Sequence, residues 1–227
     1  LPPYRQDDWD DISEMAKEIS ILKQMPRTDW AIENKQWRNI VHAYLACISF
    51  ADHQVGKVLD ALEGSPYNDN TVIVLWSDHG YHMGEKNTFQ KQSLWQRSSH
   101  VPLVIAGPNV QGGRRCDRIV SLLDMYPTLL EMCGLPANPQ NEGRSLVPLL
   151  DNPDQEWPYP AIVGWKKNSF AVQNERYRYI RYGDGSEELY DHQNDPNEWT
   201  NLAGKPELGE TKKKMAECLT RVGINRQ

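Results

Sequence analysis

The chain has 227 residues, 39% of them hydrophobic and 25% charged, which is the composition of a folded globular protein. Its formal net charge of -6 argues against a nucleic-acid partner, because contacts to phosphates need a basic face. The apolar runs fall short of the roughly 18–20 residues of a membrane span, so no membrane partner is expected. The four cysteines lack Cys-x-x-Cys spacing, and they predict small buried residues or free thiols: Cys47, Cys116, Cys133 and Cys218.

The first third of the chain predicts one long helix that leads into a strand. Apolar residues recur at spacings of three and four between Trp37 and Leu62, and Gly64 follows the last of them. No charge interrupts the β-branched and large apolar residues of Thr71–Trp76. Such a run is typical of a strand buried on both faces, so we predict that it is central in a mostly parallel sheet.

The next segments continue this alternation of helices and strands. Residues 101–106, "VPLVIA", predict a second apolar strand. The segment that follows predicts a short strand, a turn at Asp124 and a helix from about Pro127 to Cys133. We therefore expect an α/β fold, with a mostly parallel sheet flanked by helices, over residues 1–150.

The pattern changes near residue 151. Short alternating segments such as "SFAVQN" and "YRYIRYG" are separated by turn residues, and they predict hairpin strands. A last helix is expected around Glu210–Val222. Residues 151–227 are thus predicted to form a second subdomain, a small antiparallel sheet with a C-terminal helix.

The candidate chemistry lies where the strand at 71–76 ends. Asp78 and His79 offer a carboxylate and an imidazole at the carboxyl end of a strand, where ligands gather in open sheets. Gly80 permits a sharp turn or a close approach of the backbone, and Lys91 can return a cation to the same place. A metal and a lysine would together neutralise a phosphate or sulfate ester. These residue types equally suit a capped turn with a solvated lysine, so the pattern alone leaves both interpretations open.

A longer resemblance favours the first interpretation. The stretch "SDHGYHMGEKNTFQKQSLWQRSSHVPLVIAGP" resembles the second signature region of the sulfatases, in the alkaline phosphatase superfamily. The segments "AYLACISFADHQVGKVLDAL", "VSLLDMYPTLLEMCGLP" and "ELYDHQNDPNEWTNLA" are similar to the family's neighbouring elements, in the same order. His79 and "SSHVPL" are most similar to the iduronate sulfatase branch.

The resemblance implies roles for three residues. Asp78 and His79 match the ligands of the family's calcium ion, and Lys91 matches the lysine that binds a sulfate oxygen. His79 stands where relatives usually carry Asn, so two roles are open for it, metal ligand or hydrogen-bond partner of the sulfate. His82 and Lys86 lie in the following loop, where they either line the substrate entrance or are solvated. His42, His53, His100 and His192 are expected to be structural.

The rest of the family's active site has no match in this sequence. Sulfatases make a formylglycine nucleophile from a Cys/Ser-x-Pro-x-Arg motif, and "CGLPA" at 133–137 has its proline one place too late and no arginine. Two further acidic metal ligands are also missing. The resemblance therefore implies the C-terminal portion of a sulfatase, whose partner is the missing N-terminal half; the start "LPPY" fits an internal position in a longer protein.

The expected function of the whole protein is hydrolysis of a sulfate ester on a small molecule or glycan, with bound Ca²⁺. The family resemblance suggests a periplasmic, secreted or lysosomal location. Two alternatives remain open: a two-zinc phosphodiesterase or phosphatase of the same superfamily, and a non-catalytic binding or assembly module.

Overall fold

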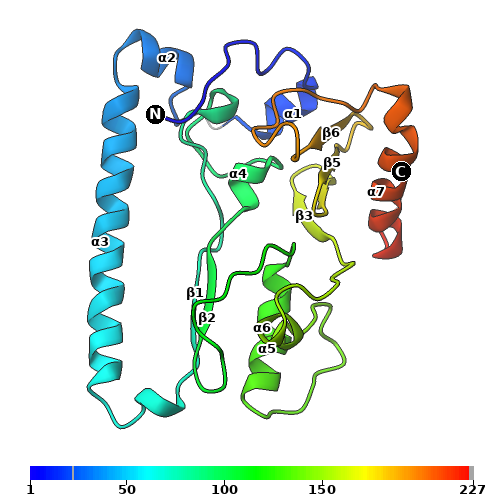
Figure 1. The fold of residues 1–227 in the computed structure, drawn as a ribbon. Helices are drawn as coiled ribbons and strands as arrows, with labels where there is room; N and C mark the ends of the chain where they lie inside the picture. The colour runs from blue at the N-terminus through cyan, green and yellow to red at the C-terminus, as the bar shows by residue number, and fades with distance from the viewer. Residues whose placement is uncertain (22, 225–227) are drawn as a thin grey trace.

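The structure, a computed structural model, describes residues 1–21 and 23–224. Its longest element is helix α3, Trp37–Glu63, which ends at the cap residue Gly64 and confirms the long helix predicted from the apolar repeat. Two short helices precede it, α1 (Glu14–Ile19) and α2 (Thr28–Glu33). In Figure 1, α3 runs down one side of the molecule, and a 3₁₀ turn at Asn68–Asn70 leads from its far end to the first strand.

The first two strands form an antiparallel pair, so the predicted parallel sheet is wrong. Strand β1 (Ile73–Trp76) pairs with β2 (Leu103–Ala106), and within the described residues this pair is a sheet of its own. Leu75 and Trp76 are 44% and 47% exposed, so β1 is neither central nor buried on both faces. An apolar run indicates that a strand is suited to a buried environment. It does not indicate whether the strands and helices that would cover it belong to the same chain.

The segment after β2 is helical where a short strand was predicted. A 3₁₀ turn, Leu122–Asp124, leads directly into α5 (Met125–Met132). Ser121 and Asp124 form a capping box, in which the backbone N–H of Ser121 donates to Asp124 Oδ2 at 2.8 Å. These side chains satisfy the free N–H groups of a helix start, and this favours a helix over an extended strand here. Helix α6 (Val147–Asp151) follows.

The C-terminal prediction is confirmed. Four antiparallel strands pair in sequence order, and a final helix packs on them. Their bounds are Ala161–Trp165 (β3), Ser169–Gln173 (β4), Tyr177–Arg181 (β5) and Glu187–Asp191 (β6), with a 3₁₀ turn at Pro206–Leu208 before α7 (Gly209–Arg221). The division into 1–150 and 151–227 stays a prediction.

Both faces of this sheet are covered, which makes it the main core of the protein. On one face, Met215 and Leu219 of α7 pack with Tyr179 and its neighbours. On the other face, α1 and the buried residues Leu94 and Trp95 pack against the sheet. The loop between β1 and β2 therefore rests on the C-terminal sheet, as Figure 1 shows for its short helix α4 (Gln96–Ser99). None of the described helices is long and apolar enough to cross a membrane.

Candidate active site

The turn after β1 is held in place by a glycine. The backbone N–H of Gly80 donates to the carbonyl oxygen of Ser98 in α4, at 2.8 Å. A Cβ at position 80 would lie 2.1 Å from the carbonyl oxygen of Arg97, far inside contact distance. Gly80 therefore permits a close approach to α4, and this contact fixes Asp78 and His79 beside the loop that carries Lys91.

The structure brings the three predicted site residues together. Lys91 Nζ lies 2.7 Å from His79 Nε2, and Asp78 Oδ1 lies 3.7 Å from the same nitrogen. His79 Nδ1 lies 2.9 Å from the carbonyl oxygen of Gly80. Because a carbonyl only accepts hydrogen bonds, Nδ1 carries the proton and the lone pair of Nε2 accepts from the Lys91 ammonium. His79 is thus fixed in one tautomer, with the lone pair of Nε2 turned toward Lys91 and Asp78.

These residues line an open cavity of about 1250 Å³. Its other walls come from β2, the segment 114–123, and β3. The cavity is also lined by Gln173 of β4 and Arg178 of β5, which the sequence analysis did not select. The one available signal was a basic residue inside the apolar strand pattern "YRYIR", and it does not say what Arg178 contacts.

The donors for a metal ion are partly present. Asp78 has an exposed carboxylate, and His79 Nε2 has a lone pair pointing into the cavity. The described residues contain no group of three or more His, Cys, Asp or Glu side chains that could hold a metal ion. Calcium takes six to eight ligands, most of them oxygens. These two donors are compatible with part of a calcium site, and they do not complete one by themselves.

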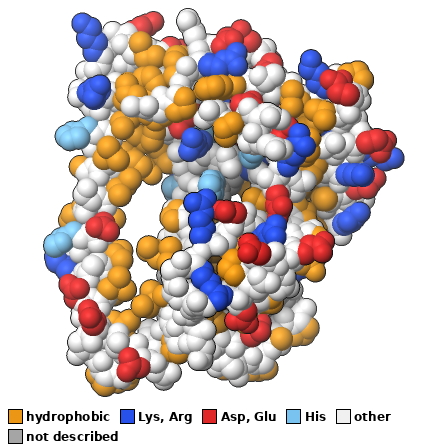
Figure 2. All heavy atoms as spheres, viewed as in Figure 1, with side chains coloured by type: hydrophobic (Ala, Val, Ile, Leu, Met, Phe, Trp, Pro, Cys, Tyr) orange, Lys and Arg blue, Asp and Glu red, His pale blue; other side chains and the backbone are white. Residues whose placement is uncertain are grey.

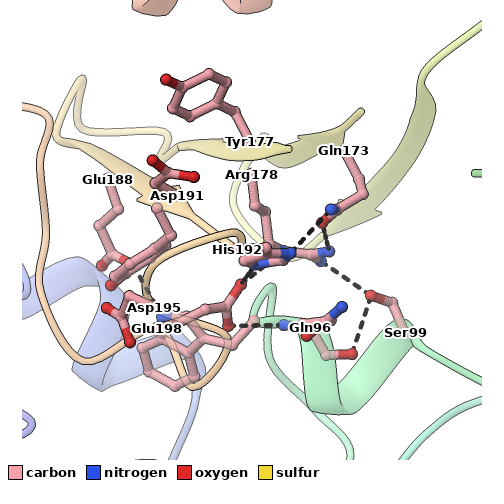
Figure 3. Close-up of polar contacts among 12 residues, drawn as sticks. Gln96, Ser99, Gln173, Tyr177, Arg178, Glu188, Asp191, His192, Asp195 and Glu198 are labelled. Carbon is pink, nitrogen blue, oxygen red and sulfur yellow. Dashed lines mark hydrogen bonds and ion pairs between the residues drawn. The ribbon is translucent and has the colours of Figure 1, made fainter. Parts of the chain in front are cut away.

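A closed ring of hydrogen bonds joins the cavity wall to the C-terminal sheet (Figure 3). Arg178 donates from Nη2 to Ser99 Oγ at 2.9 Å and from Nη1 to Gln173 Oε1 at 3.0 Å. The Gln173 amide donates to His192 Nδ1 at 3.0 Å, and His192 Nε2 lies 2.9 Å from Glu198 Oε1. The backbone N–H of Gln96 donates to Glu198 Oε2 at 2.9 Å, and the ring closes where Ser99 Oγ donates to the carbonyl oxygen of Gln96 at 3.4 Å; its residues are Gln96, Ser99, Gln173, Arg178, His192 and Glu198.

The charges of this ring are buried. The side chains of Arg178 and Glu198 are 2% and 3% exposed, and the two lie 3.6 Å apart. Burial lowers the pKa of Arg178 below its ordinary value, although Glu198 opposes the shift. Burial acts to raise the pKa of Glu198, but the hydrogen bond from His192 and the charge of Arg178 lower it overall. This confirms a structural role for His192, because its imidazole supports the carboxylate that holds α4.

Lys86 and His82 are both buried. Both roles considered for them, lining the substrate entrance and lying in solvent, are therefore wrong. Lys86 Nζ forms an ion pair with Asp8 Oδ1 at 2.7 Å, and burial raises the pKa of Asp8 to about 6 although Lys86 acts to lower it. His82 Nε2 lies 2.9 Å from Ser93 Oγ, which lies 2.6 Å from Ser98 Oγ. Burial lowers the pKa of His82 to about 3, so the imidazole is neutral. Lys86 thus anchors the segment before Lys91 to Asp8, and His82 anchors Ser93, which follows Lys91.

The other single-residue predictions have mixed outcomes. His100 lines the cavity, and partial burial lowers its pKa. All four cysteines are free thiols, which confirms one of the two predictions made for them. The other prediction, small buried residues, is wrong for Cys47, Cys116 and Cys133, which are exposed.

Comparison with known families assigns the chain to one family. The model of the Sulfatase family matches residues 4–135, and the model described as N-sulphoglucosamine sulphohydrolase, C-terminal, matches residues 84–225. The chain belongs to the sulfatase family.

Individual relatives agree with this assignment. A sulfatase from Formosa agariphila is 50% identical over 202 residues, which cover 89% of this chain and 40% of the relative. Human arylsulfatase K is 31% identical over 88% of this chain and 40% of its own length. The solved structure of a 2-O GAG sulfatase superposes with a TM-score of 0.82 at 26% identity, over 98% of this chain and 53% of that one. The chain thus spans about two fifths of the length of the curated relatives it matches.

Proposed function

We propose that this chain supplies one wall of the active site of a sulfatase that hydrolyses sulfate esters of carbohydrates. The observation that carries the proposal is the cluster of Asp78, His79 and Lys91, whose polar atoms meet within 3.7 Å at the edge of a large open cavity. The cluster lies inside the region matched by the Sulfatase family.

Lys91 is proposed to bind the sulfate group. Its ammonium has three donors, one of which contacts His79 in this structure. The other two can reach oxygens of a sulfate in the cavity, where they would stabilise the negative charge that builds up in the transition state. In this structure the ammonium is held by His79, whose imidazole is in turn fixed by the carbonyl of Gly80.

Asp78 and His79 are proposed to hold a calcium ion together with donors from outside the described residues. When bound, the cation would polarise the sulfate oxygens and offset charge on the ester. In the tautomer seen here, His79 has no free N–H for the sulfate, because its Nδ1 proton is used by Gly80. Of the two roles left open by the sequence, ligation through Nε2 is therefore the one we propose, and it requires Lys91 to turn its ammonium toward the sulfate.

The nucleophile and the substrate pocket are proposed to lie elsewhere in the whole protein. The sequence contains no Cys/Ser-x-Pro-x-Arg motif, so a formylglycine must come from a segment that this chain does not include. A sulfated glycan is the proposed substrate because one matched structure is a 2-O GAG sulfatase. The iduronate sulfatase branch and a periplasmic, secreted or lysosomal location stay predictions from the resemblance.

The test is a chimera in which residues 1–227 replace the matching part of the Formosa agariphila sulfatase. The proposal expects this chimera to hydrolyse an aryl sulfate and to release sulfate from a sulfated glycosaminoglycan. Faster hydrolysis of an aryl phosphate, dependent on zinc, would favour the phosphatase alternative. A folded chimera without any of these activities, beside an active parent, would favour the non-catalytic alternative. The 227-residue chain alone is expected to show no turnover above a heat-killed control, because it lacks the nucleophile.

A further inference from the structure

His82 is a buried residue whose place the proposed function does not explain. It follows the proposed metal ligand His79 by three residues. The space-filling view shows histidine, basic and acidic side chains meeting beside the opening near its middle (Figure 2), but His82 is 0% exposed and is part of no such surface. It is not among the described residues that line the cavity, so it does not touch a ligand bound there. Burial removes the imidazole from water at a cost that an apolar side chain would avoid, and its contacts indicate what offsets this cost.

His82 contacts the chain on both sides of Lys91. Its backbone N–H donates to the carbonyl oxygen of Gln90 at 2.8 Å. Its ring nitrogen Nε2 lies 2.9 Å from Ser93 Oγ, and the backbone N–H of Ser93 donates to the carbonyl oxygen of Lys91 at 3.1 Å. The backbone that carries the proposed sulfate-binding lysine is thus held by one residue from both directions.

The same contacts continue to the turn that carries the proposed metal ligands. Ser93 Oγ lies 2.6 Å from Ser98 Oγ in α4. The carbonyl oxygen of Ser98 accepts from the backbone N–H of Gly80 at 2.8 Å, and Gly80 directly follows His79. Buried groups therefore join the two halves of the candidate site. We call the hydrogen-bonded side chains of His82, Ser93 and Ser98 the His82 link.

The His82 link is buried along its whole length. Ser93 and Ser98 are 5% and 6% exposed. Each hydroxyl donates and accepts, and a neutral imidazole nitrogen does one or the other, so the link is complete in either direction. Because a buried polar group without a partner is costly, such a link holds its geometry more strictly than an apolar cluster does. The ring of Trp95 packs edge-on against the imidazole, at 6.1 Å between ring centroids, and further limits its movement.

We infer that His82 is a positioning residue, which sets the distance between Lys91 and the pair Asp78 and His79 through the His82 link. This rests on the proposed function for the roles of those three residues. A sulfate that contacts a lysine and a cation at once needs both groups at a fixed separation, and a misplacement of about 1 Å can cost about 10² in rate. Since the stem of a lysine is flexible, the backbone beneath it is the part that other residues can hold in place.

The competing explanation is that His82 only fills space beneath the loop. In that case a leucine should serve as well as the histidine, and a glutamine should bring no advantage. Positioning predicts the opposite order, because the amide of a glutamine places a polar atom near the position of Nε2 and can bond to Ser93. The variants His82→Leu and His82→Gln therefore separate the two explanations.

The first measurement is amide hydrogen exchange of the 227-residue chain by NMR. The amide of Gly80 reports on the turn, because it donates to Ser98, and the amide of Ile180 in the central strand β5 reports on global unfolding. We expect His82→Leu to raise the exchange rate of Gly80, relative to that of Ile180, at least about tenfold. His82→Gln should change this ratio by less than about threefold, since it keeps a bond to Ser93.

The second measurement is turnover by the chimera described above. His82→Leu is expected to lower kcat by about 10–100-fold at a temperature where the variant is folded. His82→Gln should lower kcat by less than about threefold. The double variant His82→Leu, Ser93→Ala should be no slower than His82→Leu, because both changes break the same link. Leu219→Ala is the control: it removes a buried contact of α7 on the other face of the sheet, so it should lower the melting temperature and leave kcat unchanged.

The outcomes separate this inference from the proposed function. If the exchange of Gly80 responds as expected but the chimera with an unchanged His82 is inactive, the link is supported and only the proposed function is contradicted. An unchanged exchange ratio in His82→Leu would overturn the inference, and so would a His82→Leu chimera with an unchanged kcat. It would also be overturned by equal losses of kcat in His82→Leu and His82→Gln, or by additive effects of His82→Leu and Ser93→Ala.

Discussion

Arg178 of β5 donates from Nε to the carbonyl oxygen of Leu94 at 2.7 Å and from Nη2 to Ser99 Oγ at 2.9 Å, so one guanidinium of the C-terminal sheet spans the segment just after Lys91. The same side chain lines the cavity. These hydrogen bonds connect the C-terminal sheet to the loop that carries the candidate site. This connection is buried, and it depends on a small number of polar contacts.

Arg178→Met is expected to destabilise the chain by about 3–5 kcal/mol, because it leaves Glu198 buried without the opposite charge. Urea unfolding followed by tryptophan fluorescence measures this effect. Arg115→Met is the control, since Arg115 is exposed and, among the described residues, pairs only with its neighbour Asp117, and it should change the free energy of unfolding by less than about 1 kcal/mol. Equal stabilities of the two variants would show that the ring around Arg178 does not hold the sheet to α4.

The burial of His82 predicts a pH dependence of stability. Its pKa in the folded protein is about 3, below the ordinary 6.5, chiefly because of burial. As the pH falls below about 6.5, the unfolded chain takes up a proton that the folded chain does not, so the unfolded state is favoured. The contribution of neutral His82 is therefore complete above about pH 6.5 and is lost progressively toward pH 3.

His82→Gln removes this titration and should flatten the stability profile. Between pH 6 and 4, the free energy of unfolding of the unchanged chain should fall more steeply than that of the variant, by up to about 1.4 kcal/mol per pH unit. The raised pKa of Asp8 acts in the opposite direction below about pH 6, but it is present in both proteins and cancels in the difference. Urea titrations at four pH values measure the two slopes, and parallel slopes would contradict the assignment of a buried neutral imidazole.

Gly80→Ala tests the close contact that positions Asp78 and His79. The new methyl group would clash with the carbonyl of Arg97, so the turn or α4 must shift, at a cost of about 1–3 kcal/mol. Gly56→Ala is the matched control, because Gly56 lies inside α3 with open space around its Cα, and an alanine there should stabilise the helix by about 0.5–1 kcal/mol. Thermal unfolding of both variants checks the opposite signs, and a stabilised Gly80→Ala would refute the contact.

These contacts show which features of the molecule the sequence determines locally. Helix α3 and the C-terminal strands follow from apolar periodicity, since that pattern reflects the burial of each residue and the turn residues mark the ends. The direction of β2 relative to β1 does not follow, because the path of the 26 residues between the two strands is set by contacts with the distant C-terminal sheet. Apolar content alone was equally compatible with a parallel pair.

The candidate site divides in the same way. Asp78, His79 and Lys91 were predicted because they follow one strand and match one family motif, and the structure brings them together. The burial of Lys86 was not predictable, since its carboxylate partner Asp8 is 78 residues away in the chain. Arg178 was missed for a similar reason: its contacts lie 79 and 84 residues away, and nothing within the strand pattern specifies them.

The most direct test of the site compares Asp78→Ala with Lys91→Ala in the active chimera. If Asp78 is a metal ligand, its loss should abolish activity and weaken calcium binding, because no other carboxylate among the described residues is grouped with His79 to replace it at the ligand distance of about 2.3–2.6 Å. Lys91→Ala should leave calcium bound and slow turnover by about 10²–10³, since its ammonium acts on the sulfate oxygens. Both variants should keep the native melting temperature, because Asp78 and Lys91 are exposed and outside the core. A calcium titration and a sulfate-release assay on the two proteins provide the readouts. If Asp78→Ala retains both its calcium affinity and its rate, the Asp-His-Gly segment is a structural turn held by Gly80, and the metal lies elsewhere.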